Sequence, residues 1–354
     1  MEPLIGKEEA AAMQEYLKGD VWLTEFRKTE EFEQQICGFT GSKHCVVTNN
    51  GTISLVMALL ASGIKPGDEV IVPDFTMIAT PNSAKLIGAK PVLVDVEKDT
   101  LCIDMEKAKE AITKKTKCLI HVSFNGRTND LYKVKKFCAE NEIAFIEDAA
   151  QSLGSFYRGK HIGTFGDIGS LSFSPPKIIT TGQGGALLTD DSELHNKMKK
   201  LKDFGRTSGG NDLHDTIGYN FKFTDMQAVI GIEQMKKLQQ RIKRKKEMYG
   251  LYHDSLKDIR EIEFIPTDLE STAPWFIDIY VDEPEKLASF LKENSIGTRP
   301  VYPPVNEQEA YNTQGDFPVT KNYAHRGLWL PSSLRLSDSD ITRVCSTIKK
   351  FYGE

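Results

Sequence analysis

Short apolar runs alternate with segments of helical periodicity along the first two-thirds of the chain. The runs predict buried β-strands at residues 46–48, 69–72, 91–94, 118–121 and 144–147. Between them, apolar positions three and four residues apart predict helices at residues 53–61, 105–112 and 131–139. Strands that alternate with helices favour an α/β fold, with a mostly parallel sheet flanked by helices. Ligands of such sheets bind at the carboxyl ends of the strands.

The pattern changes in the last third of the chain. From about residue 224 to residue 254 it predicts one long helix. Two apolar segments at 264–266 and 275–281, and a helix at 285–293, then suggest a smaller C-terminal α+β domain. We therefore expect a large domain of residues 1–240 and a small domain of residues 241–354.

Composition narrows the class of protein. The chain has 354 residues, 40% of them hydrophobic and 27% charged, which is typical of a globular protein. A net charge of -5 argues against a nucleic-acid partner. We find no apolar run that approaches the roughly 18 residues of a membrane span, and no secretory signal. The six cysteines and seven histidines show no metal-ligand spacing. We expect a cytoplasmic protein that binds neither metal nor membrane.

Candidate chemistry lies in two neighbouring segments. An apolar strand ends at Asp148, and a second strand leads to Lys177 and a turn rich in threonine and glycine. Pyridoxal phosphate needs a lysine amine for its Schiff base and a carboxylate at its pyridine nitrogen. It also needs donors around its phosphate, and the segment Asn50-Gly51-Thr52 follows a strand and opens a helix. Ser172 is near enough to Lys177 in sequence to be a further phosphate donor.

Each of these features has a common structural explanation. An aspartate after a strand usually caps a helix or turn, and a lone lysine is usually solvated. Asn-Gly-Thr before a helix is usually a simple cap. Residues 154–160 match the spacing of a phosphate-binding P-loop, but His161 stands where that loop needs serine or threonine. The combination of Lys177, Asp148 and the Gly51-Thr52 segment is far more specific than its members.

The whole chain resembles the DegT/DnrJ/EryC1/StrS sugar aminotransferases, which have the type I fold of aspartate aminotransferase. The motifs that carry the resemblance are residues 50–52, 66–73, 147–151, 172–177, 180–185, 218–220 and 224–228. The resemblance implies a pyridoxal phosphate cofactor, with Lys177 as the Schiff-base lysine and Asp148 as the pyridine partner.

The remaining roles also follow from the resemblance. Gln151 corresponds to the residue near the cofactor's phenolic oxygen, and Gly51, Thr52 and Ser172 correspond to phosphate ligands. Asn220 corresponds to a phosphate ligand donated by the neighbouring subunit, which implies a homodimer with shared active sites.

Three positions depart from the family's usual residues. The residue that packs on the cofactor ring is commonly aromatic, and here it is expected to be Met77, whose thioether can also pack on a ring. Lys222 stands where an arginine is frequent. The C-terminal substrate segment often carries a histidine, whereas this chain has Asn306 after Tyr302. We expect Lys222, Tyr302 and Asn306 to contact the substrate.

The resemblance implies transfer of the amino group of glutamate to a keto sugar linked to a nucleotide diphosphate. A 4-keto-6-deoxyhexose is the first choice and a 3-keto sugar the second. One alternative is a pyridoxal-dependent sugar dehydratase, although in this family that activity goes with a histidine in place of the lysine. The other is a non-catalytic regulatory protein that retains the fold.

Overall fold

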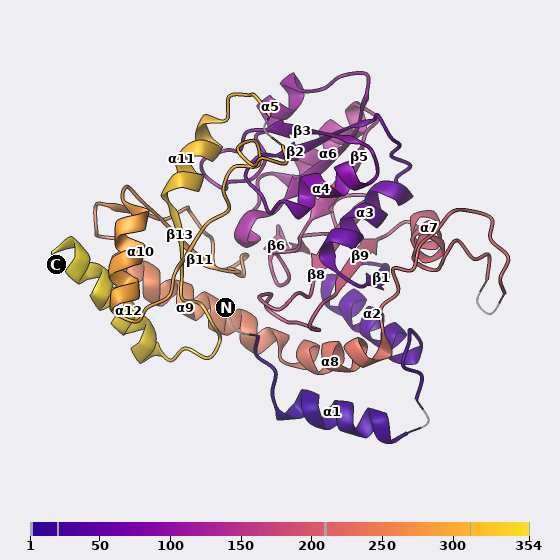
Figure 1. Ribbon diagram of the computed structural model, residues 1–354, viewed down its shortest axis with the longest axis horizontal. Coiled ribbons are helices and arrows are strands. Elements are labelled where there is room, and N and C mark those ends of the chain that lie inside the picture. Colours follow the sequence, from indigo (N-terminus) through magenta and orange to yellow (C-terminus); the bar gives the residue numbers. More distant parts are fainter. Residues whose placement is uncertain (1–2, 20, 209–210, 312, 354) are drawn as a thin grey trace.

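A seven-stranded sheet lies at the centre of the computed structural model, which describes residues 3–19, 21–208, 211–311 and 313–353 (Figure 1). The strand order is β1-β9-β8-β5-β4-β2-β3. β9 is antiparallel to both of its neighbours, and the other neighbouring pairs are parallel. The strands are β1 (His44–Thr48), β2 (Glu69–Pro73), β3 (Lys90–Val94), β4 (Thr116–Val122), β5 (Ala144–Asp148), β8 (Ile168–Ser172) and β9 (Gly185–Thr189).

Both faces of this sheet are buried, as the continuous apolar strands predict. Successive side chains point to opposite faces, so Val46 and Val47 belong to two different apolar clusters. The helices that cover one face include α2 (Arg27–Thr40), α6 (Leu131–Glu140) and α8 (Asp225–Lys236). Three others cover the opposite face: α3 (Gly51–Ala61), α4 (Ala79–Leu86) and α7 (Ser192–Lys202). The fold class predicted from the sequence is thus present.

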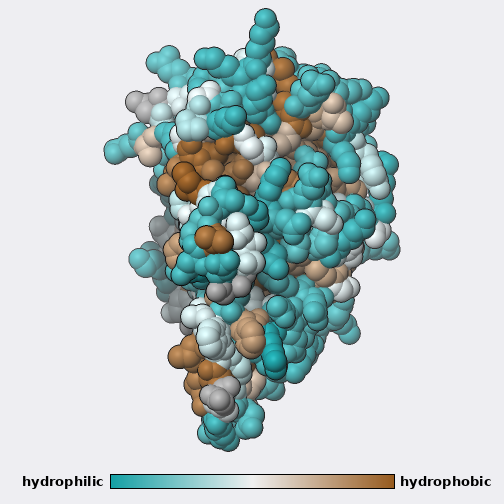
Figure 2. Space-filling model, turned by 90° about the vertical axis from the view of Figure 1, so that its right-hand side faces the viewer, coloured by the Kyte–Doolittle hydropathy of each residue, from teal (hydrophilic) through white to brown (hydrophobic). Residues whose placement is uncertain are grey.

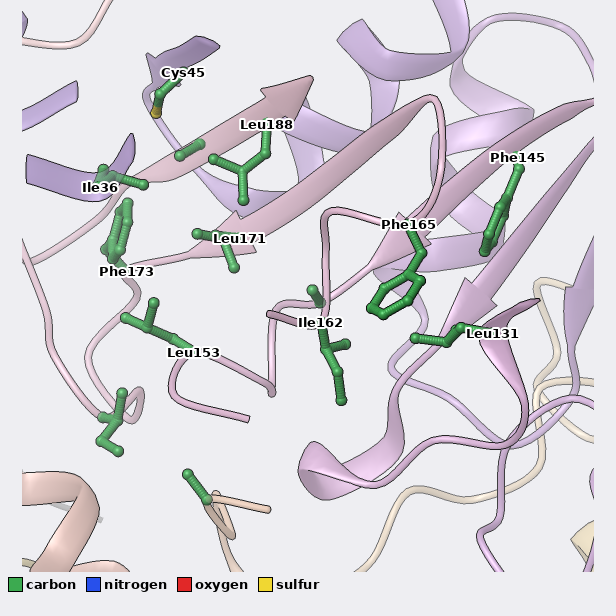
Figure 3. Packing of buried hydrophobic residues seen from close by; sticks show 14 of the residues in the cluster. Ile36, Cys45, Leu131, Phe145, Leu153, Ile162, Phe165, Leu171, Phe173 and Leu188 are labelled. Carbon is green, nitrogen blue, oxygen red and sulfur yellow. The ribbon is translucent and has the colours of Figure 1, made fainter. Parts of the chain in front are cut away.

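Figure 3 shows part of the core on the α2 side of the sheet. Leu171 of β8 and Leu188 of β9 lie near Ile36 of α2, and Phe173 follows directly after β8. The Phe173 ring lies 5.2 Å from that of Phe32 on α2, centroid to centroid. This packing fixes the chain that leaves β8, four residues before Lys177.

A second sheet of four antiparallel strands lies in the C-terminal part of the chain, in the order β10-β11-β13-β12. The strands are β10 (Ile262–Glu263), β11 (Ile277–Val281), β12 (Arg299–Pro300) and β13 (Gly327–Leu330). The helices packed with it include α9 (Leu238–Leu256), α10 (Pro284–Glu293) and α12 (Asp338–Tyr352). A further aromatic cluster joins Phe75 and Phe124 of the large sheet's loops to Trp275 and Trp329 of this unit.

The single long helix expected from residue 224 to residue 254 is wrong, because α8 ends at Lys236 and α9 begins at Leu238. Lys237 has φ -98° and ψ -5°, and its amide donates to the carbonyl of Gln234, three residues earlier. Its Nζ lies 2.6 Å from a carboxylate oxygen of Glu9. The break contains neither proline nor glycine, so no local residue pattern predicts it.

The helix α9 passes from the large sheet to the C-terminal sheet (Figure 1). Its first turns contribute Leu238 and Ile242 to the core of the large unit. Tyr252 and Leu256, further along, belong to the core of the C-terminal unit. The domain boundary at residue 240 stays a prediction, and it falls within this shared helix. Among the described residues, no helix is both long and apolar enough to cross a membrane.

Candidate active site

The candidate site is a pocket of about 640 Å³ at the carboxyl ends of the parallel strands. Eight of the predicted site residues line it: Gly51, Thr52, Met77, Asp148, Gln151, Ser172, Lys177 and Tyr302. Two other hollows, of about 800 and 780 Å³, have walls that contain neither Lys177 nor Asp148. The 640 Å³ pocket is therefore the one that brings the predicted catalytic residues together.

Lys177 follows β8 in the loop that forms one wall of the pocket. Its Nζ lies 3.7 Å from the ring centroid of Trp275, which precedes β11. The indole N–H of Trp275 donates to the carbonyl of Pro176 at 2.8 Å, so the tryptophan is tied to the lysine's own loop. Burial lowers the pKa of Lys177 to about 7, and the negative charge of Asp148 opposes this only in part. A large fraction of this amine is therefore uncharged near neutral pH.

Asp148 is the last residue of β5 and is buried. One of its carboxylate oxygens accepts a hydrogen bond from the Thr80 hydroxyl at 2.7 Å, and the other accepts one from the Ala150 amide at 3.2 Å. Burial raises the pKa of Asp148 above its usual range, and these hydrogen bonds and the charge of Lys177 oppose this only in part. A carboxylate held in this way can pair with a cationic ring nitrogen.

The amino end of α3 enters the pocket beside Ser172. Asn50 caps the helix, because its side chain accepts from the amide of Ile53 at 2.9 Å. Among the described residues, no protein oxygen accepts from the amides of Gly51 and Thr52. A Cβ at Gly51 would lie 2.9 Å from the Ser172 Cβ, so only glycine allows this close approach. Two amides and a hydroxyl therefore gather at a helix N-terminus, which suits an anion such as phosphate.

Gln151 lines the pocket with its amide in a fixed orientation. Its Oε1 accepts from the backbone amide of Asn125 at 2.7 Å. The Nε2 amino group is thereby left to donate to a bound group.

Met77 and Tyr302 lie on other walls of the same pocket. Met77 is 42% exposed, and its sulfur accepts from the amide of Ala79 at 3.0 Å. The Tyr302 ring is packed edge-on against Trp329, with 4.8 Å between the ring centroids. Both side chains can contact a ligand in the pocket. The packing of Met77 on the cofactor ring and the contact of Tyr302 with the substrate stay predictions.

Three predicted residues lie outside this pocket. Asn220 is exposed and pairs through its backbone with Asp203. The Lys222 amine lies 2.6 Å from the Asp203 carboxylate and lines the 800 Å³ hollow. The backbone amide of Asn306 donates to the Asp74 carboxylate at 2.8 Å. A single chain thus does not bring Asn220, Lys222 or Asn306 to Lys177.

Sequence reasoning missed three residues that the fold adds to the site. Thr80 donates to Asp148. Trp275 covers Lys177, and Arg299 lines the pocket from β12. Among the described residues, no carboxylate forms an ion pair with Arg299. The sequence draws attention to Thr80 only because it lies three residues after Met77, in the segment that follows β2.

The fold defines the class of protein, since it is that of the type I pyridoxal-phosphate-dependent transferases. The chain belongs to the DegT/DnrJ/EryC1/StrS aminotransferase family, which matches residues 3–349. The expected fold class, family and enzyme class are confirmed.

Characterised relatives cover nearly the whole chain. GDP-perosamine synthase of Vibrio cholerae is 32% identical over 92% of this chain and 90% of its own length. GDP-perosamine synthase of Escherichia coli O157:H7 is 34% identical, with the same coverage of both chains. The crystal structure of DesV from S. venezuelae is similar with a TM-score of 0.92 and 29% identity, over 98% of this chain and 95% of that one.

Proposed function

We propose that this aminotransferase binds pyridoxal phosphate through Lys177 and moves the amino group of glutamate to a keto sugar linked to a nucleotide diphosphate. The observation that carries the proposal is the meeting of an amine of pKa about 7, a buried carboxylate and a helix N-terminus in one pocket. The match of the chain to the DegT/DnrJ/EryC1/StrS aminotransferase family supports the proposal.

The residues present fit the cofactor. When bound, pyridoxal phosphate supplies a reactive carbonyl carbon and a ring that accepts electrons from the amino acid. Lys177 would hold it covalently, and the Asp148 carboxylate would keep its ring nitrogen protonated. The free amides of Gly51 and Thr52 and the Ser172 hydroxyl would hold its phosphate. Gln151 would donate to its phenolic oxygen, and Met77 would pack on its ring.

Lys177 has a second task in this proposal. Its Nζ would carry a proton between the amino-acid carbon and the cofactor. A pKa of about 7 suits this task, because the amine can both accept and release a proton near neutral pH. The Trp275 ring, 3.7 Å away, keeps water from one side of the amine. A histidine would be expected at this position in a sugar dehydratase, so Lys177 favours transamination.

The substrate would enter on the side of Arg299 and Tyr302. The relatives of this chain include GDP-perosamine synthases, which supports a nucleotide-linked sugar as the acceptor. Arg299 suits an anionic group of either substrate, because a guanidinium binds carboxylates and phosphates in a bidentate manner. Asn306 and Lys222 would contact the sugar or its phosphates. The proposed sugar is a 4-keto-6-deoxyhexose, and the proposed location is the cytoplasm.

A homodimer would complete the site. Leu213, Ile217 and Tyr219, which lie in the loop after α7, are 62%, 81% and 42% exposed. Figure 2 views the side of the molecule that carries α7 and shows brown hydrophobic patches there. Apolar surface of this kind is typical of subunit interfaces. In the dimer, the partner subunit's Asn220 would reach the phosphate donors at Gly51 and Ser172.

One experiment tests the function directly. The protein, glutamate and each of a panel of GDP-, UDP- and dTDP-linked keto sugars are incubated together, and products are detected by mass. We expect an amino sugar with one nucleotide and release of 2-oxoglutarate, with no product from Lys177→Ala. Turnover of pyruvate or oxaloacetate as efficient as that of the best nucleotide sugar would contradict the proposed acceptor.

A further inference from the structure

Asn125 occupies an unusual position beside the candidate site. It lies in the turn after β4, is 1% exposed and has a left-handed backbone, with φ 55° and ψ 29°. Residues other than glycine adopt this conformation rarely, although asparagine does so more readily than most. The contacts of Asn125 must therefore stabilise its left-handed backbone conformation.

The side chain of Asn125 pairs with the backbone of Phe276, the residue directly before β11 of the C-terminal sheet. Its Oδ1 accepts from the Phe276 amide at 2.6 Å, and its Nδ2 donates to the Phe276 carbonyl at 2.9 Å. Nδ2 also donates to a carboxylate oxygen of Asp278 at 2.6 Å. Asp278 in turn forms a buried ion pair with Arg127 at 2.7 Å.

These partners require an amide at position 125. The Phe276 amide needs an acceptor, while the Phe276 carbonyl and the Asp278 carboxylate need a donor. Aspartate has the same shape but only acceptors when ionised, so it would place a charge against Asp278. Glycine adopts the left-handed backbone conformation readily, but it has no side chain to form these hydrogen bonds.

The contacts of Asn125 lead to two walls of the pocket. Its backbone amide donates to Gln151 at 2.7 Å. Phe276 follows Trp275, and the two rings lie 3.9 Å apart, centroid to centroid. Trp275 covers the Lys177 amine at 3.7 Å and is bonded to Pro176. A displacement of the Phe276 backbone would therefore move the indole from Lys177.

We propose that Asn125 is a positioning residue that keeps Trp275 over Lys177 by fixing the backbone of Phe276. Its side chain joins the turn after β4 to the strand that follows Trp275, and so couples the two units of the chain at the amine. The inference deepens the proposed function, since it concerns the environment of the lysine assigned there to the cofactor.

The expected consequence is a change in the protonation of Lys177. The charged groups that line the pocket with it are Asp148 of β5 and Arg299 of β12, and the Tyr302 hydroxyl is the other titratable group. Substitution of Asn125 alters none of these groups. It would instead let water reach the amine, and less burial means a higher lysine pKa.

The test measures the pKa of Lys177 in the full-length protein freed of cofactor. Trace acetic anhydride labels uncharged amines, and the extent of labelling of the Lys177 peptide is followed by mass spectrometry as a function of pH. In Asn125→Gly we expect the pKa to rise by about one unit or more, toward the ordinary lysine value of about 10.4. Glycine keeps the backbone N–H that binds Gln151, so the shift reports the lost side-chain bonds.

Asn129→Ala is the matched control. This asparagine lies in the same loop, and its side chain contacts Ile103 and His121 but neither Phe276 nor Gln151. It should leave the pKa of Lys177 unchanged. An equal shift in both variants, or an unchanged titration in a folded Asn125→Gly protein, would overturn the proposal. If Asn125→Gly does not fold by circular dichroism, Asn125→Ala provides the same comparison, because alanine also lacks the side-chain bonds and adds no charge.

Trp275→Phe tests the second step. It keeps a ring beside Lys177 but removes the bond to Pro176, and the pKa should rise here too. Combined with Asn125→Gly, it should add little, since both changes act through one ring position; fully additive shifts would contradict the proposal. The labelling is done on cofactor-free protein, so it reports on the amine of Lys177 whether or not this lysine is the one that binds the cofactor. Failure of this inference is therefore distinguishable from failure of the proposed function.

Discussion

The indole of Trp275 and the amine of Lys177 are almost 100 residues apart in the sequence and lie 3.7 Å apart in the fold. Because the indole N–H also donates to the Pro176 carbonyl, the ring is tied to the loop that carries the amine. The pair joins the large sheet to the C-terminal sheet at the point where the chemistry is proposed. The reactivity of Lys177 thus depends on the packing of both units.

Lys177→Ala should lose turnover by several orders of magnitude, because the covalent anchor and the proton carrier disappear together. We expect the wild-type protein to be yellow from covalently bound cofactor, and the purified variant should lose this colour. The measurements are the steady-state rate with glutamate and the acceptor sugar, and the visible absorption spectrum. Near-normal turnover in a folded variant would show that another residue is the essential amine.

The pKa of Lys177 predicts how stability depends on pH in the cofactor-free protein. The folded-state value is about 7, and the unfolded value is about 10.4. Between them the unfolded chain binds a proton at this residue and the folded chain does not, so the free energy of unfolding rises with pH. Lys177→Met should reduce this slope by up to about 1.4 kcal/mol per pH unit.

Chemical denaturation at several pH values within that window measures the slope. Lys243→Met is the control, since the Lys243 side chain is 80% exposed. It should leave the slope as in the wild type. An identical slope in Lys177→Met would mean that the amine is not buried enough to change its protonation on folding.

Asp148→Asn should fold and react slowly. The amide has nearly the same shape and can still accept from Thr80, but it carries no charge to keep a ring nitrogen protonated. We expect the half-reaction with glutamate, followed by stopped-flow absorbance without any acceptor, to slow by at least about tenfold. An unchanged half-reaction would assign Asp148 to the fold alone.

Arg299→Ala should weaken the binding of one substrate. The guanidinium lines the pocket without a carboxylate partner among the described residues. Loss of a charged hydrogen bond should raise the KM of the acceptor sugar about tenfold or more, with a small change in kcat. Arg335→Ala, at an exposed arginine outside the pocket, should change neither constant. If the KM of glutamate rises instead, Arg299 binds the amino donor.

Much of the site could be predicted because it is local in sequence. Asp148 and Ser172 end strands, and Gly51 opens a helix directly after one. Parallel strands bring their carboxyl ends to one edge, so local motifs were enough to place these residues together. Glu147 and Asp225 also belong to the family motifs, but they do not line the pocket and instead accept hydrogen bonds from backbone amides. Glu147 accepts from the amides of Gly163, Phe165 and Gly166, and Asp225 accepts from those at the start of α2.

The rest of the site depends on contacts between distant segments. Trp275 precedes an apolar strand, and its sequence context is that of an ordinary core residue. Arg299 lies in a short strand of the C-terminal unit. Nothing near either residue indicates that it meets Lys177, because that meeting depends on how the second sheet packs on the first. Asn220 and Lys222 show the same limit, since their proposed site requires a second chain.

Complementation between subunits should show whether the site is shared. Asn220 is exposed and outside the pocket of its own chain, which fits a role in the partner's site. In a mixed dimer of Lys177→Ala and Asn220→Ala, both lesions fall in one site and the other site is intact. A statistical mixture should recover about a quarter of wild-type activity, since half of the dimers are mixed and each has one good site of two.

A mixture of Lys177→Ala with the double variant Lys177→Ala/Asn220→Ala is the matched control and should stay inactive. Lack of recovery, with mixed dimers demonstrated by native mass spectrometry, would contradict the shared site, as would a fully active monomer.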